Sequence, residues 1–341
     1  MHCLNSFFSS RIGRARQLAK AFGSVSLVLL SSVAHAQGFP SGPMRILVPH
    51  PPGGPTDIIA RIFAERFTSS VGQPVIVESR AGGNGIVLMN SVIGAPADGH
   101  TLALATNTPL ALQPAINRYT KVNDGADIQK QLKPVTYLGD SPMALAINPA
   151  RGIRSVAQLI AEAKAKPGEL RSGNGAGIGG ADHLGTELFN LAVGIRSLAI
   201  PYKGIAAVAV ALAAGEIDYA VTSVGAFIPM HNAGRLAIIA VASDKRLEYL
   251  PNVPTVSEVT GVPNFEATSW LGIWVNAAVE PRRIAALNEL FKKEGANPEV
   301  REKVLKTGYT VKTSTPEQLQ ARVDGDLKKW SDLLNRNVIK F

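Results

Sequence analysis

The sequence predicts an α/β fold built from βαβ units with mainly parallel sheets. Short runs rich in β-branched and apolar residues alternate with longer stretches whose apolar residues recur at helical spacing. Most helical stretches end at glycine or proline, as in Lys166-Pro167-Gly168 and Ala214-Gly215, which are typical helix stop signals. Strands separated in this way by helices usually pair in parallel and carry the helices on the faces of the sheet.

The expected elements follow from these patterns in chain order. The strand candidates are Arg45–Val48, Val75–Glu78, Thr101–Ala105, Met143–Ile147, Ser197–Pro201, Tyr219–Thr222, Ala237–Ala242 and Leu271–Val275. The helix candidates are Asp57–Ser70, Ile86–Ala95, Val156–Ala165, Leu184–Ala192, Ala206–Ala214, Ala226–Ala233, Pro281–Glu294, Pro298–Lys306 and Pro316–Asn335. The last three start at or near a proline and carry apolar faces, such as Leu319, Val323 and Leu327, so we expect them to cap one lobe.

The stretch from Arg45 to Asp57 gives the most specific indication of function. An apolar strand runs into the turn Pro51-Pro52-Gly53-Gly54, and a helix opens at Thr56 or Asp57. Such a turn leaves backbone N–H groups and the positive end of a helix dipole facing outward, which is how proteins hold small anions without a charged side chain. We expect Gly54 to need backbone angles that only glycine adopts easily.

The first 36 residues have the character of a cleaved signal peptide. Four basic residues precede a short apolar run, Ser24 to Val33, and Ala34-His35-Ala36 offers a cleavage site before Gln37. The run is about half of the roughly 20 residues that span a bilayer, which argues against an anchor. The sequence therefore predicts export to the periplasm.

Removal of this leader limits the classes of function. Loss of its four basic residues lowers the formal charge from +9 to +5. A positive charge of this size is only weak evidence for nucleic-acid binding. The single cysteine, Cys3, is lost with the leader, so no disulfide and no cysteine metal site are expected. The remaining chain is long enough for two ordinary domains.

Catalytic signatures are missing from the sequence. There is no His-Glu-x-x-His and no phosphate-loop Gly-Lys-Ser/Thr, and Val221 stands where a nucleophile elbow around Ser223 would need glycine. The remaining histidines lack ligand-like spacing. We therefore expect no catalytic residue, no metal and no cofactor.

The segment Gly175 to Gly180 fits the dinucleotide pattern G-x-G-x-x-G. A dinucleotide site also needs an acidic residue at the end of the next strand, but that strand ends at Pro201-Tyr202-Lys203. A glycine loop for an anion or polar ligand is the better interpretation. Asp57 and Asp182 are expected to be helix N-caps, and Lys203 a solvated surface charge.

Several more strand-end loops are small and polar. They are Thr106-Asn107-Thr108-Pro109, Asp140-Ser141-Pro142, Pro201-Tyr202-Lys203-Gly204 and Thr222-Ser223. One such loop alone is an ordinary turn, but several at one edge of facing sheets favour a binding cleft. Crossings near 139–142 and 266–270 would make lobe 1 discontinuous, with residues 40–142 plus 269–341, and would place residues 143–268 in lobe 2.

Motifs along nearly the whole mature chain resemble a known family. They include Pro51 to Asp57, Gly72 to Arg80, Ala95 to Leu102, Gly173-Asn174-Gly175, Pro201 to Gly204, Pro251 to Glu258 and Glu266 to Trp270. Together they are similar to the extracytoplasmic solute receptors of tripartite tricarboxylate transporters, the TctC or Bug family.

The resemblance implies a two-lobed periplasmic-binding-protein fold, type II-like, with a ligand cleft between two Rossmann-like βα domains. It implies a receptor without catalytic activity that closes on a small organic acid or related metabolite. The receptor would deliver this ligand to transporter membrane subunits or signal its presence. A monomer without a nucleic-acid partner is expected. The ligand-binding set that it implies is Gly53, Gly54, Thr56, Asp57, Asn107, Ser141, Gly175, Asp182, His183, Lys203, Gly204 and Ser223.

Two positions depart from the family pattern. His50 stands where a Phe is usual, and Asp182 stands where a small hydroxyl residue is usual. A carboxylate at Asp182 would repel a second ligand carboxylate, which suggests a neutral or cationic ligand end there. Two other classes of protein stay open: an exported α/β hydrolase or lyase with an atypical site, and a structural or adhesive domain without a small ligand.

Overall fold

The computed structural model describes residues 39–121, 128–177 and 179–335. The predicted signal peptide, residues 1–36, lies outside this part of the chain. Within the described residues, no helix combines the length and the apolar character needed to cross a bilayer.

The first sheet is formed by strands from the N-terminal and C-terminal parts of the described chain. Its strands are β1 (Met44–Val48), β2 (Val75–Ser79), β3 (Thr101–Thr106), β4 (Leu132–Ile147), β9 (Thr268–Asn276) and β10 (Thr310–Val311). They follow the order β2-β1-β3-β9-β4, with β10 also on β4. β1 is parallel to β2 and β3, whereas β9 is antiparallel to β3 and β4, so the sheet is mixed.

The second sheet is formed by the middle of the chain. Its further strands are β5 (Arg171–Asn174), β6 (Leu198–Pro201), β7 (Tyr219–Ser223) and β8 (Ala237–Val241). β5 is parallel to β6 and β7, and the end of β4 lies antiparallel between β7 and β8. Both sheets therefore contain the parallel βαβ pairing that the sequence predicts, with antiparallel additions that it does not predict.

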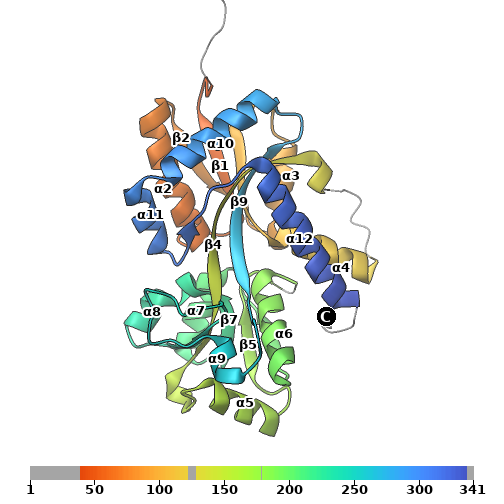
Figure 1. Cartoon of the computed structure of the whole chain (residues 1–341), viewed down its shortest axis with the longest axis vertical. Helices are drawn as coiled ribbons and strands as arrows, with labels where there is room; N and C mark the ends of the chain where they lie inside the picture. Colours follow the sequence, from red (N-terminus) through yellow and green to blue (C-terminus); the bar gives the residue numbers. More distant parts are fainter. Residues whose placement is uncertain (1–38, 122–127, 178, 336–341) are drawn as a thin grey trace, which may run out of the picture. The chain divides into compact units, whose positions relative to one another are not determined.

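One long strand, β4, belongs to both sheets. Its pairing with β9 ends at Pro142 opposite Thr268, and its pairing with β7 starts at the next residue, Met143 opposite Ser223. Figure 1 shows β4 and β9 running side by side from one group of helices to the other. The change of partner falls where the sequence predicts a lobe boundary, but the division into lobes stays a prediction.

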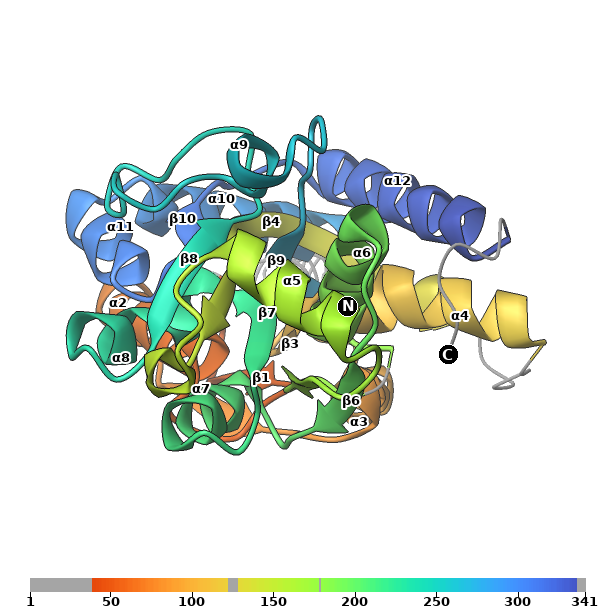
Figure 2. The same ribbon diagram turned by 90° about the horizontal axis from the view of Figure 1, so that it is seen from below.

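Helices cover both sheets (Figures 1 and 2). They are α2 (Pro55–Val71), α3 (Ile86–Ile93), α4 (Gln113–Thr120), α5 (Val156–Ala165), α6 (Ala181–Val193), α7 (Ile205–Ala214), α8 (Ile228–Asn232), α9 (Val256–Thr260), α10 (Pro281–Gly295), α11 (Pro298–Leu305) and α12 (Pro316–Asn335). Short 3-10 segments lie at Gly83–Gly85, Ile128–Gln131, Pro149–Arg151 and Val224–Ala226, and a π-helix at Thr108–Leu112.

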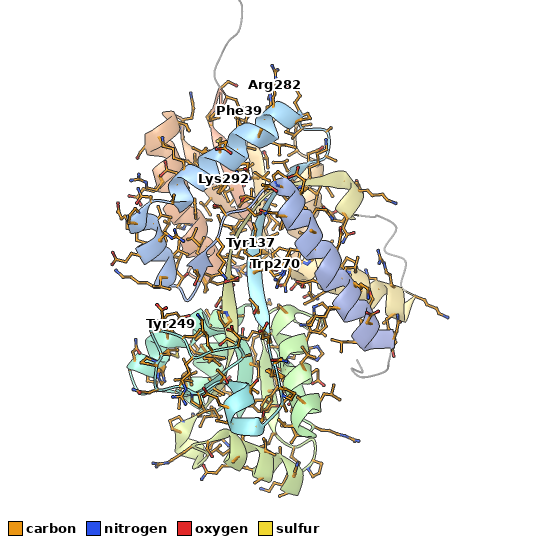
Figure 3. All side chains as sticks on the ribbon, viewed as in Figure 1. Phe39, Tyr137, Tyr249, Trp270, Arg282 and Lys292 are labelled. Atoms are coloured by element: carbon orange, nitrogen blue, oxygen red, sulfur yellow. The ribbon has the colours of Figure 1, made fainter. Side chains whose placement is uncertain are left out.

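The C-terminal helices pack on the elements of the first sheet. Phe291 of α10 contacts Phe67 of α2, with ring centroids 4.7 Å apart in an edge-to-face arrangement. The predicted apolar face of α12 is buried, and the helix packs against α4 and β4. Near the crossing, Trp270 lies 5.8 Å from the ring of Tyr137 and donates its indole N–H to Asp326 of α12 (Figure 3).

Some elements differ from the sequence prediction. β4 starts at Leu132 and not at Met143, because Lys133-Pro134 and Gly139-Asp140 interrupt the apolar pattern without ending the strand. β5 has the sequence Arg-Ser-Gly-Asn, which carries no strand pattern, yet it is covered on both sides by neighbouring elements. The π-helix, α4, α9 and β10 are absent from the prediction, and α6 starts at Ala181 instead of Leu184.

Candidate functional site

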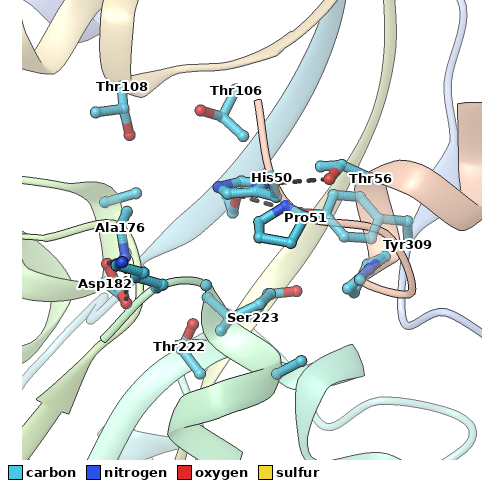
Figure 4. Close-up of a pocket in the computed structure, with 18 of the residues that line it drawn as sticks. His50, Pro51, Thr56, Thr106, Thr108, Ala176, Asp182, Thr222, Ser223 and Tyr309 are labelled. Atoms are coloured by element: carbon cyan, nitrogen blue, oxygen red, sulfur yellow. Dashed lines mark hydrogen bonds between the residues drawn. The ribbon is translucent and has the colours of Figure 1, made fainter. Parts of the chain in front are cut away.

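A cavity lies beyond the carboxyl ends of strands from both sheets (Figure 4). It encloses about 660 Å³ of space not filled by protein atoms, its open mouth included. We call it the central cavity; its lining includes His50, Pro51, Gly54, Thr56, Thr106, Thr108, Ala176, Asp182, Lys203, Gly204, Ser223 and Tyr309. An adjoining cavity shares His50, Thr106 and Lys203 with it and extends to Asn84 and Gly175.

The start of α2 leaves backbone donors free, and one of them, the N–H of Thr56, belongs to a residue that lines the central cavity. Gly54 is the N-cap and Pro55 the first helical residue, and the N–H groups of Thr56 and Asp57 have no hydrogen-bond partner among the described residues. The N–H of Gly53, in contrast, donates to Asp57 Oδ2 at 3.0 Å. Only part of the predicted grip is therefore free, and it is the part that belongs to the first turn of the helix.

Backbone angles reassign the roles of the two turn glycines. Gly53 has φ +89°, in the region that favours glycine, whereas Gly54 has φ −80° and ψ 166°. A Cβ added to Gly54 would meet only the Pro51 carbonyl oxygen, at 3.9 Å. The expectation that Gly54 needs glycine-only angles is wrong, because the sharp turn is made one residue earlier.

Two further helices start at the same cavity. Gly204, with φ 101°, precedes α7, and the N–H groups of Ile205 and Ala206 have no partner in the described part of the chain. α6 starts at Ala181, which also lines the cavity. Because each helix start carries partial positive charge, three such starts around one cavity favour an anion inside it.

The two aspartates predicted as N-caps have other roles. The N-cap residues are Gly54 and Gly180, and both aspartates lie inside the first helical turn. Asp57 closes the turn through Gly53 and pairs with Arg61. Asp182 accepts hydrogen bonds from the backbone N–H groups of Gly175 and Ala176.

The two carboxyl groups differ in acidity. Burial alone would raise the pKa of Asp57, but hydrogen bonds from Arg61 and Gly53 hold it below its usual range. For Asp182, burial dominates and raises the pKa to about 6, although backbone N–H groups oppose this. The difference arises because Asp57 has a cationic partner and Asp182 has none among the described residues.

Burial also keeps His50 neutral. It lowers the pKa of His50 to about 4, and the ring Nδ1 lies 3.1 Å from Thr56 Oγ1. Lys203 is therefore the one cationic side chain among the described residues that line the central cavity. Anion binding here would depend mainly on neutral donors, namely backbone N–H groups and hydroxyls.

The structure brings together about half of the predicted site residues. Gly54, Thr56, Asp182, Lys203, Gly204 and Ser223 line the central cavity, and Gly175 lines the adjoining one. Gly53, Asp57, Asn107, Ser141 and His183 line neither of them.

These five residues have supporting positions or lie elsewhere. Ser141 is fully buried and accepts a hydrogen bond from Ser223 Oγ at 2.7 Å. His183 Nδ1 accepts the N–H of Gly179 at 3.1 Å and so holds the glycine loop. Asn107 lines another cavity together with Met143 and residues of α12 such as Trp330.

Several lining residues are missing from the predicted set, among them the polar residues His50, Thr106, Thr108 and Tyr309. The two threonines flank Asn107 in a loop that the sequence singles out, so alternation along the chain could have identified them. Tyr309 precedes the two-residue strand β10, and its hydroxyl lies 3.2 Å from Ser269 Oγ. No local sequence pattern marks it.

The geometry does not favour catalysis. Among the described residues, the hydrogen-bond partners of the Ser223 side chain are Ser141 and Tyr309, and neither is a histidine, lysine or carboxylate that could act as its base. No group of His, Cys, Asp or Glu in the described residues could hold a metal ion. The cavity contains hydrogen-bond donors suited to binding a small ligand and, among the described residues that line it, no arrangement suited to a reaction.

Two connected α/β sheets with a donor-lined cavity at their strand ends define the class of periplasmic binding proteins. The chain belongs to the tripartite tricarboxylate transporter receptor family, TctC, whose sequence pattern matches residues 59–338. This confirms the resemblance drawn from the sequence motifs. The family is one of solute-binding receptors and not of enzymes, as the sequence predicts.

Individual relatives agree with this assignment. BugT from Bordetella pertussis is 33% identical over 317 residues, which cover 92% of this chain and 94% of BugT. A solved R. palustris protein with adipate is 28% identical with a TM-score of 0.82, covering 88% of this chain and 98% of that one. The periplasmic binding protein BugD is 27% identical with a TM-score of 0.77, covering 87% and 98%.

Proposed function

We propose that this protein is exported by its predicted signal peptide and binds a small organic acid in the central cavity. The observation that carries the proposal is the pair of unpartnered N–H groups at Thr56 and Asp57, at the positive end of a 17-residue helix. The similar R. palustris structure with adipate supports a carboxylate as ligand. The receptor would deliver the acid to membrane subunits of a tripartite tricarboxylate transporter, or signal its presence.

The proposed binding motion is a closure of two lobes, residues 40–142 plus 269–341 and residues 143–268. Backbone contacts between these segments support it, because a Cβ on Gly225 would lie only 1.6 Å from the Thr307 carbonyl oxygen. A Cβ on Gly177 would lie 3.2 Å from Asn84 Oδ1, on the side of the adjoining cavity. β4 and β9 would form the hinge, since they connect the two segments.

The proposed contacts follow from the lining of the cavity. Thr56 and Ile205 would donate backbone N–H groups, as would Asp57, the next residue after Thr56, and Ser223 and Tyr309 would offer hydroxyls. Of the residues implied by the family resemblance, Gly53 and Ser141 would support these donors and His183 would hold the glycine loop, and none of the three would touch the ligand. The receptor would act as a monomer.

The test is a thermal-shift screen of the purified mature chain against C3 to C8 mono- and dicarboxylates, followed by calorimetry of the hits. At least one acid should raise the melting temperature in a saturable way, with 1:1 stoichiometry. NMR of the recovered ligand should show it unchanged. Conversion of the ligand would favour the hydrolase or lyase alternative, and the lack of any carboxylate hit would contradict the proposal.

A further inference from the structure

The side chain of Asp182 occupies backbone donors that would otherwise be open to a ligand. It is 2% exposed and accepts hydrogen bonds from Gly175 N–H and from Ala176 N–H, the latter at 3.3 Å. The N–H of His183 donates to its other oxygen at 3.1 Å. Figure 4 shows the carboxylate beside Ala176 at the edge of the cavity.

The chain's own carboxylate thus fills the anion site that the glycine loop provides. Two successive N–H groups at a strand end form a concave donor pair that ordinarily attracts a ligand anion. Here the two N–H groups are already hydrogen-bonded to Asp182. A ligand carboxylate cannot take the same donors without displacing a side chain that is fixed to the helix α6.

Asp182 still has acceptor capacity left for a ligand. An ionised carboxylate has about four lone-pair sites, and three backbone N–H groups donate to this one. No lysine or arginine among the described residues forms an ion pair with it, and it lines the central cavity. An unneutralised acceptor is therefore available to a group that can donate a hydrogen bond.

The start of α2 has the reverse character. Thr56 lines the cavity and presents a free N–H group from α2, within the described chain. The free N–H groups of Ile205 and Ala206, at the start of α7, lie instead beside Gly175, on the side of Asp182. The donor from α2 attracts a carboxylate, whereas Asp182 repels one. The two ends of the cavity therefore differ: the end at α2 is suited to an anionic group of the ligand, and the end at Asp182 is suited to a hydrogen-bond donor group.

Resting on the proposed function, we infer that Asp182 determines ligand specificity and selects a monocarboxylate whose other end donates a hydrogen bond. Hydroxyl, amide or ammonium groups at that end satisfy the acceptor of Asp182. A second carboxylate there meets a like charge and finds the loop donors occupied. The ligand class is thus hydroxy, amido or amino acids of matched length, and dicarboxylates bind more weakly.

The experiment compares ligands that differ only at one end. Calorimetry measures the wild type with adipate, 6-hydroxyhexanoate and 6-aminohexanoate, and with the four-carbon set succinate, 4-hydroxybutyrate and 4-aminobutyrate. In at least one set the donor-terminated acid should bind tenfold or more tightly than the diacid. In Asp182→Asn, which keeps the shape and removes the charge, this preference should shrink at least tenfold.

Glu187→Gln is the matched control. Glu187 lies on the same helix and outside both ligand cavities, so its neutralisation removes one charge and should leave the preference unchanged. If Asp182→Asn fails to fold by circular dichroism, Asp182→Ser takes its place.

Each outcome decides the inference. An unchanged preference in Asp182→Asn, or a diacid as the tightest wild-type ligand, overturns the role of Asp182 and leaves the receptor function intact. Binding of no carboxylate by the wild type or by any variant overturns the proposed function together with the inference.

Discussion

The carboxylate of Asp57 accepts a hydrogen bond from the backbone N–H of Gly53, four residues earlier, at 3.0 Å. Arg61, one helical turn further on, donates to both oxygens of the same carboxylate at 3.0 Å. A single buried side chain therefore closes the turn and ties it to α2. This leaves the N–H groups of Thr56 and Asp57 for a ligand, because the carboxylate is turned toward the turn and not toward the cavity.

Replacing Asp57 tests this arrangement. Asp57→Ala should lower the free energy of unfolding by about 2–3 kcal/mol, because it leaves Gly53 N–H unpaired and removes a buried charge-assisted hydrogen bond. It should also weaken carboxylate binding about tenfold, because the helix start loses its fixed geometry. Urea unfolding and calorimetry measure the two effects.

Arg61→Gln is the control for Asp57→Ala. The Arg61 side chain is 57% exposed, so its loss should cost less than about 1 kcal/mol and leave ligand affinity nearly unchanged. Equal effects of the two variants would show that the ion pair, and not the Gly53 contact, holds the turn.

Mutations of Ser141 and Ser223, the two serines where β4 passes from one sheet to the other, should have different effects on ligand binding and stability. Ser223 lines the cavity and donates to Ser141, which is fully buried behind it. Ser223→Ala should weaken ligand binding about five- to tenfold with little loss of stability. Ser141→Ala should lower stability by about 1 kcal/mol and weaken binding less, since Ser223 loses only its acceptor. Reversed affinities would place the ligand against Ser141 instead.

Gly225 should be essential for closure. A Cβ there would lie 1.6 Å from the Thr307 carbonyl oxygen, and one on Gly308 would lie 2.4 Å from Gly225 Cα. We expect Gly225→Ala to hold the two segments apart, with a larger radius of gyration by small-angle X-ray scattering in the presence of ligand and at least tenfold weaker binding. Gly325→Ala is the control, because a Cβ on Gly325 would meet no atom within 4 Å. Gly234→Ala is unsuitable as a control, because Gly234 has φ +69°. A closed Gly225→Ala with normal affinity would contradict the proposed motion.

His50 should make the unliganded protein sensitive to acid. Burial lowers its pKa from 6.5 to about 4, so between these values the unfolded chain binds a proton that the folded chain does not. Stability contributed by neutral His50 is complete above pH 6.5 and is lost as the pH falls toward 4. With allowance for its partial exposure, the loss is about 2 kcal/mol.

The measurement is the difference in unfolding free energy between wild type and His50→Gln at pH 7.5 and at pH 4.5. Asp182, whose pKa is raised, acts in the opposite direction, but it is present in both proteins and cancels in the difference. The variant should gain relative stability at pH 4.5. A difference that does not vary with pH would show that His50 is accessible to protons in the folded protein.

The sequence predicts the helices and the parallel strands because their apolar spacing and their glycine or proline ends are local properties. Val156–Ala165 and Pro316–Asn335 have the predicted bounds. β5 and the first half of β4 escape prediction because their residues become strand only through pairing with distant partners. Tertiary pairing decides such segments.

The candidate site also has parts that local sequence patterns predict and parts that depend on tertiary structure. The turn before α2 and the loop before α7 can be predicted, since a glycine-rich strand end followed by a helix is a local pattern. The orientation of a side chain cannot be predicted from a local pattern. Asp57, Ser141 and Asp182 form hydrogen bonds with nearby backbone or with a neighbouring strand. Tyr309 reaches the cavity only because β10 adds to β4.

The most direct test of the central claim is a crystal structure of the mature protein with the tightest carboxylate from the screen. The account predicts a carboxylate oxygen within about 3.2 Å of the backbone nitrogen of Thr56 or Asp57, with Gly53 N–H still bonded to Asp57. A ligand carboxylate bound elsewhere, with those two N–H groups facing only water, would contradict it.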